Sequence, residues 1–595
     1  MASRAACIFG IEESLGGKAW RWRGGNMDLS GGPGGLDDDI ITQLLLSRGI
    51  PREDIERQRA PSLRAFLPDP SEFRDMDAGA ERLAQAVLTG ETVTIFGDYD
   101  VDGATSAALL IRLLRALGNT PRPYIPDRLL EGYGPSADAL VRIAGGGSSL
   151  IVTVDCGAMA HEALEAAHGA GADVIVVDHH KCSAELPRAV ALINPNRLDE
   201  GDIGAAHGHL AAVGVAFLLA IATLRTLRQR GFFTDRPEPD LFGLLDLVAL
   251  GTVADVAALH GLNRALVAQG LKVMARRENI GMAALIDSAR LTRPPSCSDL
   301  GFALGPRINA GGRVGEASLG VRLLTTEDPD EARDIAAQLS RLNEERRGIE
   351  AVVQEEAEAQ IAGQHNRAVL VLAGRGWHPG VIGIVAGRIK EKAGKPALVI
   401  ALDADGDGNG KGSGRSITGV DLGAAIIAAR QAGLLIAGGG HAMAAGLTVA
   451  PGKVEVLADW LDAHLGAAVT AAGGRQAFKL DLALAPGGLT PDLVTLLESA
   501  GPFGNGWPGP RVCVGPVRLI KADVVGTSHV RLIVAGEDGG RFKGIAFRAA
   551  ESVLGQSLLH GARARRFWLA GRARIDDWSS RPQAELHIED AAWAD

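Results

Sequence analysis

Cysteine and aromatic residues are scarce in this chain of 595 residues, which has five cysteines, three tyrosines and an aromatic content of 4%. No two cysteines form a Cys-x-x-Cys pair, which argues against a structural zinc module or a disulfide framework. The five are Cys7, Cys156, Cys182, Cys297 and Cys513. No sequence feature supplies a base that would activate Cys156 or Cys182, so we expect both to be small packing residues.

Long hydrophobic runs are also missing. No uninterrupted apolar stretch approaches the roughly 18 residues of a membrane span. The N-terminal segment has too many polar residues and glycines for a secretory signal, so we expect a cytoplasmic protein. With 46% hydrophobic and 22% charged residues, the composition is that of a globular protein, and a chain of this length should divide into about three or four domains.

Positive charge is in deficit, with a formal net charge of −10 and an isoelectric point of about 5.8. Spread evenly, this charge would disfavour nucleic acid as a partner. The acids concentrate in a few motifs, however, while arginines recur in separate clusters, so a local basic path is possible. Most of the cationic side chains are arginines, which suit bidentate contacts with phosphate.

The most informative motif is Gly97-Asp-Tyr-Asp-Val-Asp-Gly103, which follows the apolar run Val93–Phe96. If the backbone stays extended, the carboxylates of Asp98, Asp100 and Asp102 point to one face. Because crowded like charges repel, a bound cation is the natural resolution, and an acidic turn is the alternative.

Three further strand-like apolar runs each end in an acid: Leu150–Val154 before Asp155, Val174–Val177 before Asp178-His179-His180, and Leu247–Ala254 before Asp255. In an open parallel sheet, ligands collect beyond the carboxyl ends of the strands, where these groups would meet. A shell of carboxylate oxygens with one or two imidazoles suits Mn²⁺ or Mg²⁺ better than structural zinc.

The histidine pair calls for separate roles, since neighbouring residues on a strand point to opposite sides and cannot easily serve one metal. We assign His179 to the metal and His180 to a substrate phosphate or to protonation of a leaving group. Two divalent cations about 3.5 to 4 Å apart, sharing a carboxylate, would activate a water for in-line attack on phosphorus. Asp155 is the candidate for the shared carboxylate.

Together and in this order, GDYDVDG, VDCG, DHH and GTVADV resemble the four metal motifs of the DHH phosphoesterase superfamily. The resemblance implies hydrolysis of a phosphoester or phosphoanhydride. Carried over by position, it implies the metal ligands Asp100, Asp102, Asp155, His179 and Asp255. It also implies Asp98 and Asp178 as close supports and His180 as a phosphate contact.

The chain divides into five regions. Residues 1–76 indicate a peripheral N-terminal region. Residues 77–325 alternate strand-like runs with helical runs such as Thr105–Leu117 and Val213–Arg228, which is typical of a doubly wound α/β sheet. Residues 326–362 predict a long helix with Pro329 in its first turn, either joining two domains or lying on the surface.

Residues 363–470 begin a second α/β pattern with the strand-like runs Arg367–Ala373 and Pro396–Ala401. Three glycine-rich motifs follow, which we interpret as turns that let the backbone approach phosphates. They lie at 377–385, 412–416 and 438–446.

Residues 471–595 contain short strand-like segments such as His529–Val534, Phe542–Phe547 and Arg566–Ala570, which predict a small β-barrel. Basic and aromatic residues interleave in Arg563–Trp568, where they could stack on and neutralise single-stranded nucleic acid. The alternative is a barrel with merely charged outer positions.

Five more motifs resemble the bacterial single-strand-specific exonucleases of this superfamily: GPRINAGGR, WHPGVIGIVAGRI, GSGRS, GGGHAMAAG and PFGNGWPGP. The match runs from about residue 92 to 510, and the barrel fits the remainder. It implies a DHH domain and a DHHA1 domain joined by the long helix, followed by an OB-type barrel. In PFGNGWPGP, Trp507 and Gly509 stand where the usual pattern has asparagine and glutamate. We expect this departure to affect the junction with the barrel rather than catalysis.

This resemblance implies 5′-to-3′ degradation of single-stranded DNA to 5′-mononucleotides, with Mn²⁺ or Mg²⁺, in recombination and repair. It implies that Arg128, Ser413 and Arg415 hold the 5′ phosphate. The remaining substrate-binding candidates are Arg307, Asn309, Arg313, Ser416 and His441. It further implies a single-strand-binding protein and a RecQ-type helicase as partners, and we expect a monomer.

Two other functions stay open on sequence alone. A DHH-family oligoribonuclease or cyclic-dinucleotide phosphodiesterase would act on short substrates and tolerate loss of the barrel. A non-catalytic single-strand-binding repair scaffold would bind without forming product, although the intact metal motifs argue against it.

Overall fold

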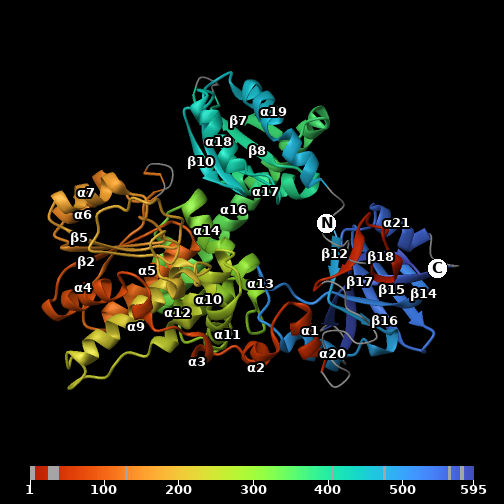
Figure 1. Ribbon diagram of the computed structural model, residues 1–595, viewed down its shortest axis with the longest axis horizontal. Coiled ribbons are helices and arrows are strands. Elements are labelled where there is room, and N and C mark those ends of the chain that lie inside the picture. The colour runs from red at the N-terminus through yellow and green to blue at the C-terminus, as the bar shows by residue number, and fades with distance from the viewer. Residues whose placement is uncertain are drawn as a thin grey trace.

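The computed structural model describes residues 7–24, 39–127, 131–132, 134–404, 408–473, 477–560, 565–576 and 582–594. Arg128 lies outside these residues. Figure 1 shows an α/β domain with attached helices, a second α/β domain reached through a long helix, and a barrel at the C-terminal end.

The first domain contains a parallel five-stranded sheet in the order β3-β2-β4-β5-β6. Its strands are β2 (Val93–Gly97), β3 (Arg122–Tyr124), β4 (Leu150–Val154), β5 (Asp173–Val177) and β6 (Ala191–Ile193). Successive residues of a strand pack into different cores, Ile175 with α5 and α9 but Val176 with α6 and α7. The doubly wound sheet is therefore confirmed.

Helices cover both faces of this sheet. They are α4 (Met76–Thr89), α5 (Val101–Ala116) and α9 (Ala212–Gln229) on one face, and α6 (Ala137–Gly145) and α7 (His161–Gly169) on the other. Both helical runs predicted in this region are confirmed. Among the described residues, only α9 is a helix long and apolar enough to cross a membrane, and 72% of it is buried inside the protein.

The rest of this domain is helical. Its elements are α10 (Leu245–Ala254), α11 (Gly261–Met274), α12 (Ile280–Ser288), α13 (Cys297–Asp299), a π-helical turn (Leu300–Leu304), α14 (Gly305–Val314) and α15 (Leu319–Thr325). The prediction of a strand at Leu247–Ala254 was wrong. Since α10 is packed against both α5 and α11, its residues are apolar on every side, and a short apolar run does not distinguish a buried helix from a buried strand.

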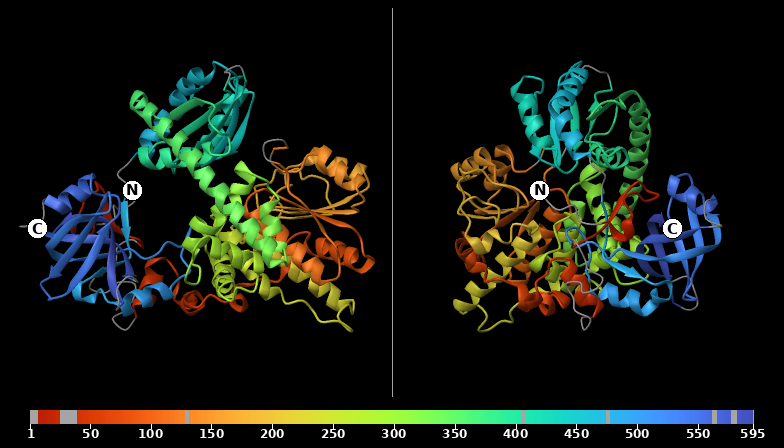
Figure 2. Two further views of the ribbon diagram at one scale, coloured as in Figure 1. Left: turned by 180° about the vertical axis from the view of Figure 1, so that it is seen from behind. Right: turned by 45° about the vertical axis from the view of Figure 1, so that its right-hand side comes forward.

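Helix α16 (Pro329–Ile361) joins the two α/β domains, as predicted (Figures 1 and 2). Asp328 caps its first turn by accepting hydrogen bonds from the backbone N–H groups of Asp330 and Glu331, and Pro329 occupies the first helical position. One part of the helix packs on α12 and α14, and another packs on β7 (Leu370–Arg375) and α17 (Ile382–Ala393).

The second α/β domain has a mixed sheet in the order β10-β11-β9-β8-β7. Its other elements are β8 (Ala397–Leu402), β9 (Gly410–Arg415), β10 (Ala437–His441), β11 (Ala444–Val449), α18 (Leu422–Gln431) and α19 (Val454–Ala472). Two of the three predicted glycine-rich turns are mainly strands, since 412–415 lies in β9 and 438–446 forms the β10–β11 hairpin. At Gly414 a Cβ would lie 2.6 Å from Leu422 Cδ2, so here glycine permits close packing within the domain.

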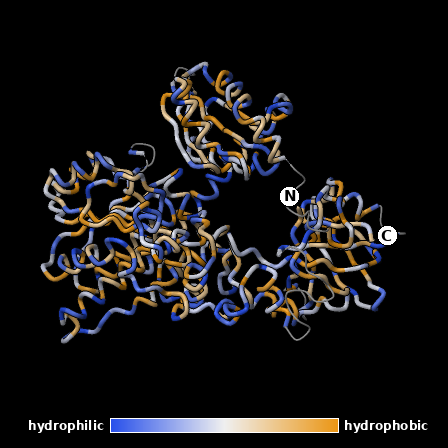
Figure 3. Tube along the Cα trace, in the orientation of Figure 1, coloured by the Kyte–Doolittle hydropathy of each residue, from blue (hydrophilic) through white to orange (hydrophobic). Residues whose placement is uncertain are grey.

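The C-terminal sheet closes into a barrel with the order β13-β14-β15-β16-β18-β17 and a further β14–β17 pairing. Its elements are β13 (Leu482–Leu484), β14 (Val512–Val525), β15 (His529–Gly536), β16 (Arg541–Ala546), α21 (Val553–His560), β17 (Arg566–Asp576) and β18 (Gln583–Trp593). This is the OB-type barrel predicted from the sequence. Figure 3 shows hydrophobic and hydrophilic residues interleaved along its strands.

The N-terminal segment is less peripheral than the sequence indicates. Strand β1 (Ala19–Trp22) pairs with β12 (Ala477–Leu480) beside the barrel. Trp20 is fully buried and donates a 2.9 Å hydrogen bond from Nε1 to Asp590 Oδ2. The first described residues of the chain are therefore built into the C-terminal unit. Short helices follow at α1 (Ile40–Ser47), α2 (Ile55–Arg59) and α3 (Leu63–Phe66), and α20 (Pro491–Ser499) precedes the barrel strands.

Trp507 lies where the N-terminal segment, the first domain and the barrel meet. It is buried between two guanidinium groups, those of Arg48 at 4.8 Å and Arg264 at 4.6 Å from the ring. Its Nε1 donates a 3.0 Å hydrogen bond to the carbonyl oxygen of Ala500. Trp507, which departs from the family pattern, therefore lies at the domain junction.

Candidate active site

The candidate active site lies beyond the carboxyl ends of the first sheet. Asp98 follows β2, Asp155 follows β4 and Asp178 follows β5, and each is at most 3% exposed. Asp102 and Asp255 come from helix ends rather than from strands, at the start of α5 and the end of α10. The sheet and the helices packed on it bring these carboxylates to one place.

The first aspartate motif does not stay extended, which corrects the expectation of three carboxylates on one strand face. Asp100 instead caps α5, because its Oδ1 accepts hydrogen bonds from the N–H groups of Asp102 (2.9 Å) and Gly103 (3.1 Å). A Cβ at Gly103 would lie 2.4 Å from the carbonyl oxygen of Asp98, so the fold-back of this loop requires glycine.

Asp102 is held by the first turn of α9. Its carboxylate accepts hydrogen bonds from the N–H groups of Ala212 (2.7 Å) and Val213 (2.9 Å). The positive end of the helix dipole favours a negative charge there. On the neighbouring α10, a Cβ at Gly251 would lie 2.2 Å from Thr105 Oγ1 and 3.0 Å from Asp102 Oδ1, so the close approach of α10 to α5 depends on this glycine.

Asp155 connects the ligand groups. Its backbone has a φ of +61°, in the left-handed region that residues other than glycine rarely adopt and that recurs at functional sites. The residues form three sets, and within each set the potential ligand atoms lie within 4.8 Å of one another. The sets are Asp98 with Asp100 and Asp155, Asp155 with His179 and His180, and Asp102 with His179 and Asp255. Asp155 belongs to two of these sets, as expected of a shared carboxylate.

The charges of this cluster repel one another. Burial raises the pKa of Asp155 well above its ordinary value, and the carboxylates of Asp100 and Asp102 raise it further. Burial also raises the pKa of Asp102, and burial together with Asp102 and Asp100 raises the pKa of Asp255 to about 8. A divalent cation among these oxygens would offset the repulsion. Carboxylate oxygens with an imidazole nitrogen are a donor set that fits Mn²⁺ or Mg²⁺.

His179 presents one nitrogen to the acids. Its Nδ1 lies 3.0 Å from the carbonyl oxygen of Leu210, a contact that requires a proton on Nδ1. The other nitrogen, Nε2, is buried, makes no hydrogen bond with any described residue and lies 3.2 Å from Asp155 Oδ1. A fixed tautomer with its second nitrogen directed at carboxylates is what a metal-ligating histidine needs.

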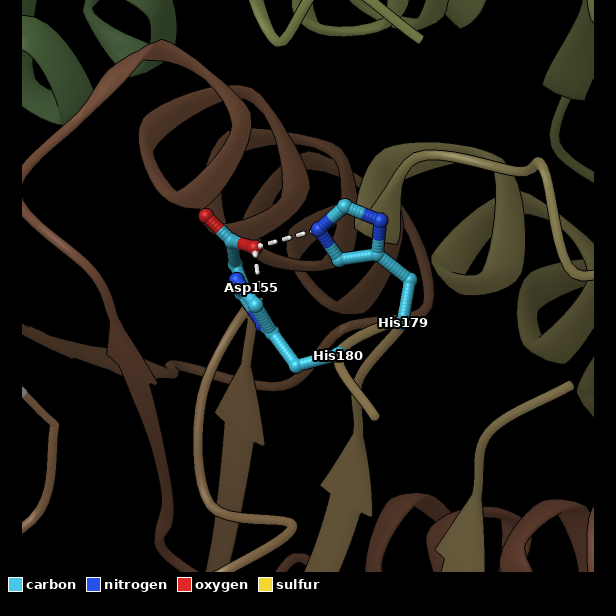
Figure 4. A group of neighbouring side chains, drawn as sticks. All are labelled: Asp155, His179 and His180. Atoms are coloured by element: carbon cyan, nitrogen blue, oxygen red, sulfur yellow. Dashed lines mark ion pairs between the residues drawn. The ribbon is translucent and has the colours of Figure 1, made fainter. Parts of the chain in front are cut away.

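His180 is paired with Asp178, its Nδ1 lying 2.7 Å from Asp178 Oδ1. Burial opposes ionisation of both groups, but the hydrogen bond and the opposite charges outweigh it. They lower the pKa of Asp178 to about 2 and raise that of His180 to about 9. The expectation that the two histidines point to opposite sides of a strand was wrong, because β5 ends at Val177 and residues 178–180 belong to the loop that follows it. Their rings lie 4.5 Å apart, and both lie beside Asp155 (Figure 4).

Two asparagines that the sequence reasoning missed hold this loop in place. Asn194 Nδ2 donates a 2.7 Å hydrogen bond to the carbonyl oxygen of His180, and Asn196 Nδ2 donates a 2.6 Å bond to that of His179. Their signal in the sequence was Asn194-Pro-Asn196 directly after β6 (Ala191–Ile193), at the same edge of the sheet.

Three of the predicted substrate-binding residues, Arg307, Asn309 and Arg313, lie on α14. This helix packs directly on the first aspartate motif, since a Cβ at Gly312 would lie 2.7 Å from the carbonyl oxygen of Tyr99. Arg307 is half-buried and donates to Ser340 Oγ (3.1 Å) and to the carbonyl oxygen of Ala303 (2.7 Å). Asn309 is half-buried as well.

Arg313 reaches from α14 towards the second domain. Its Nη1 donates a 2.9 Å hydrogen bond to the carbonyl oxygen of Gly380, in the loop before α17. Ser413 and Arg415 lie together on β9, with Arg415 Nη1 donating to Ser413 Oγ at 3.2 Å. A Cβ at Gly383 would come within 3.0 Å of Ser413 Oγ, so both side chains face the N-terminal turn of α17. A hydroxyl, a guanidinium and a helix N-terminus together suit a phosphate.

Ser416 differs from its neighbours. It is 1% exposed and donates a 2.7 Å hydrogen bond from Oγ to the carbonyl oxygen of Val420. Its hydroxyl is thus engaged inside the domain, and the structure corrects its assignment as a substrate contact.

His441 and His180 line one cavity of about 400 Å³. His180 comes from the first domain and His441 from the end of β10 in the second, and Met159 and Lys181 complete part of the wall.

The cysteines near the site are protonated packing residues, as expected. Burial raises the pKa of Cys156 well above its ordinary value and that of Cys182 to about 11.

Comparison with known families divides the chain in the same way as the fold. Residues 92–252 match the DHH family N-terminal domain, residues 366–467 match the DHHA1 domain, and residues 480–590 match the RecJ OB domain.

Curated relatives match over most of the chain. The single-stranded-DNA-specific exonuclease RecJ of Dickeya dadantii is 38% identical over 92% of this chain and 95% of its own length. The exonuclease of the same name from Escherichia coli is 38% identical over 85% of this chain and 89% of its own length.

Solved structures agree. The crystal structure of RecJ in complex with Mn²⁺ from Thermus thermophilus superposes with a TM-score of 0.76 and 28% identity, covering 93% of this chain and 75% of that one. The Mg²⁺ complex from the same organism gives a TM-score of 0.70 at 27% identity, covering 93% of this chain and 74% of that one. The four metal motifs, the three domains and these relatives together place the chain in the RecJ family of single-stranded-DNA-specific exonucleases.

Proposed function

We propose that this protein is a single-stranded-DNA-specific exonuclease that degrades the strand from its 5′ end and releases 5′-mononucleotides, in recombination and repair. The observation that carries the proposal is Asp155, which belongs to two adjacent ligand groups beside a cavity lined by His180 and His441. Such a centre suits phosphodiester hydrolysis, and the cavity lies between the two domains that would hold the terminal nucleotide.

The metal ions would be Mn²⁺ or Mg²⁺, held by Asp100, Asp102, Asp155, His179 and Asp255. When bound, such ions supply an activated water and neutralise charge that develops on the phosphate. Asp98 and Asp178 support the ligands. His180, kept protonated by Asp178, donates to a phosphate oxygen or protonates the leaving oxygen.

The selectivity for a 5′ end is assigned to Ser413 and Arg415, together with Arg128. A charge-assisted arginine contact with a terminal phosphate distinguishes an end from the interior of a strand. Arg307, Asn309 and Arg313 on α14, with His441, would line the path of the strand. Contacts of this kind read phosphates rather than bases, so binding should be independent of sequence.

The family resemblance also supports several finer assignments. We infer a cytoplasmic monomer that works with a single-strand-binding protein and a RecQ-type helicase. We also propose domain boundaries near residues 76, 325, 362 and 470, with the qualification that the described part of residues 7–24 packs with the C-terminal unit.

The test is a time course on an oligonucleotide labelled separately at its 5′ and 3′ ends, single-stranded and duplex, with Mn²⁺ or with EDTA. The proposal predicts mononucleotides released from the 5′ end of the single strand only, and none with EDTA. Release from the 3′ end, or hydrolysis of di- and trinucleotides alone, would instead indicate a short-substrate phosphodiesterase. Binding without any product would indicate a scaffold.

A further inference from the structure

The residue that follows the proposed metal ligand Asp255 has a strained backbone. Asp255 caps the end of helix α10, and the next residue, Val256, has a φ of +61°. The N–H of Val256 donates a 3.2 Å hydrogen bond to the carbonyl oxygen of Val253. The N–H of Ala257 donates another, also 3.2 Å, to that of Thr252. These two bonds form a Schellman motif, whose left-handed position usually holds glycine, so a β-branched valine there is strained.

A contact from the C-terminal unit fixes this strained residue. Asn505 Nδ2 donates a 2.7 Å hydrogen bond to the carbonyl oxygen of Val256. The backbone carbonyl oxygen of Asn505 accepts a 2.8 Å hydrogen bond from the N–H of Leu259. The Val256 side chain is 63% exposed, so its own burial offsets little of the strain. Strained residues persist where their surroundings fix them, and they concentrate at active sites.

Glycines on both sides let Asn505 approach this segment. A Cβ at Gly504 would lie 2.7 Å from Leu259 Cδ1. At Gly506, which has a φ of +70°, a Cβ would lie 3.1 Å from the Cβ of Ala258. The segment after Asp255 and the turn that carries Asn505 are therefore packed closely against each other.

The turn that carries Asn505 is itself fixed. The N–H of Gly504 donates to the carbonyl oxygen of Trp507 at 2.9 Å, and the N–H of Trp507 donates back to that of Gly504 at 3.2 Å. The Trp507 ring lies between the guanidinium groups of Arg48 and Arg264. Asn505 is thus presented by a closed turn whose base is held at the domain junction.

We propose that Asn505 is a positioning residue for the metal centre. It fixes the backbone of Val256 and thereby the place of the Asp255 carboxylate. That carboxylate completes a ligand group with Asp102 and His179. The inference rests on the proposed function, because Asp255 is one of its metal ligands. Ligands that are held in place before the ion arrives bind it more tightly, so a loop of the C-terminal unit contributes to the metal affinity of the first domain.

The test is a calorimetric titration of the full chain with Mn²⁺, comparing the wild type with Asn505→Ala. We expect the ion held by Asp255 to bind about tenfold more weakly in the variant, since the outer contacts of metal ligands are worth about 10- to 100-fold in affinity. In nuclease assays at subsaturating Mn²⁺, kcat should fall and the KM for the single strand should not change. Excess Mn²⁺ should restore kcat.

A substitution at Val256 distinguishes positioning from a general loss of stability. Val256→Gly removes the strain, because glycine adopts the left-handed region at no steric cost. In that background, Asn505→Ala should weaken Mn²⁺ binding only about twofold or less, since no strained residue is left for the hydrogen bond to hold. A contact that only stabilises the fold would give the same loss in both backgrounds.

Ser499→Ala is the matched control. It also removes a hydrogen bond from an exposed side chain to a backbone carbonyl in the C-terminal unit, from Ser499 Oγ to Leu496 at 2.6 Å, but this bond stays within α20. The variant should bind Mn²⁺ like the wild type. Melting temperatures measured with EDTA should show that Ser499→Ala and Asn505→Ala are both folded.

Wild-type Mn²⁺ affinity in Asn505→Ala would overturn the inference, and so would an equal loss with Val256 and with Gly at that position. Asp255→Asn separates this outcome from failure of the proposed function. If Asp255→Asn loses an ion while Asn505→Ala does not, the positioning role alone is refuted. If Asp255→Asn binds Mn²⁺ like the wild type, Asp255 is not a ligand, and the proposed metal centre fails together with the inference.

Discussion

The metal cluster and the surface of the barrel differ in how their charges are held. In the cluster, Asp98, Asp102 and Asp155 are at most 3% exposed, and Asp102 is fixed by two backbone N–H groups. At the barrel surface, the side chains of Arg572 and Arg574 are 37% and 42% exposed. Buried like charges cost much unless a cation joins them, whereas exposed cations cost little and contribute little singly.

This difference indicates a division of labour between the two regions. Chemistry at phosphorus needs groups fixed before the substrate arrives, so it lies at the end of a rigid parallel sheet. Holding a long strand needs many weak contacts, which a surface can supply. Substitutions in the cluster should therefore have large effects on turnover, and substitutions at the surface should have smaller effects on affinity.

The largest effect is expected for Asp155→Asn, which preserves the shape of the shared ligand but removes its charge. Changes around a metal ligand cost about 10- to 100-fold, so loss of the shared ligand itself should lower kcat by more than about 100-fold. Single-turnover rates on a 5′-phosphorylated single strand would measure this. A loss of less than tenfold, with stability unchanged, would remove Asp155 from the centre.

Arg415→Gln tests whether the second domain selects the 5′ end. A hydrogen bond to a charged group is worth about 1.5 to 3 kcal/mol, so kcat/KM on 5′-phosphorylated strands should fall about 10- to 100-fold. Strands with a 5′ hydroxyl should be affected much less, and the variant should lose its preference between the two. Equal losses on both substrates would show that Arg415 does not contact the end phosphate. Lys411→Gln, an exposed cation on the same strand, is the control.

Gly251→Ala tests how rigidly the helices hold the cluster. The added methyl group would meet Thr105 Oγ1 at 2.2 Å and Asp102 Oδ1 at 3.0 Å, so we expect a loss of about 3 kcal/mol in unfolding free energy together with weaker Mn²⁺ binding. The control is Gly387→Ala in α17, where a Cβ would meet no atom within 4 Å in the described part of the chain beyond its own helix backbone and its chain neighbours. It should instead stabilise the protein by up to about 1 kcal/mol. Equal melting temperatures for the two variants would contradict this packing argument.

Asp246 gives the smallest predicted effect and a pH dependence away from the metal cluster. Burial raises its pKa from 3.8 to about 6, and its Oδ1 accepts a hydrogen bond from the N–H of Leu247. Since the folded state favours the protonated carboxyl, its contribution is fully present below about pH 4. It is lost as the pH rises to about 6, lowering stability by roughly 2 kcal/mol. Denaturant unfolding across this range should show that Asp246→Asn flattens the decline. An unchanged profile would contradict the raised pKa.

The sequence predicted the metal cluster well because acids at strand ends signal a site wherever the strands are parallel. The prediction failed where the local residue pattern is set by tertiary packing rather than by the type of secondary structure. The run 247–254 is apolar because helices surround it, which a strand core would equally require. The motif 412–416 is rich in glycine because neighbouring side chains pack closely against β9 at Gly414. The carboxylates and imidazoles followed from residue patterns, whereas the arginines proposed to bind phosphate came from resemblance alone.

Long-range contacts could not be predicted from the sequence either. Nothing near Trp20 indicates that it will bond to Asp590, and nothing near Trp507 indicates that Arg48 and Arg264 will enclose it. The neighbouring histidines were misplaced for a different reason. Their opposite orientation assumed a strand, but the strand ends at Val177, and Asn194 and Asn196 hold the histidines in the loop that follows.

The most direct test of the account is the number of Mn²⁺ ions bound per chain, measured by calorimetric titration of the wild type and of Asp155→Asn. The claim that Asp155 joins two ligand groups predicts two ions for the wild type and at most one, bound more weakly, for the variant. A single ion in the wild type, or two ions bound with unchanged affinity in Asp155→Asn, would contradict it.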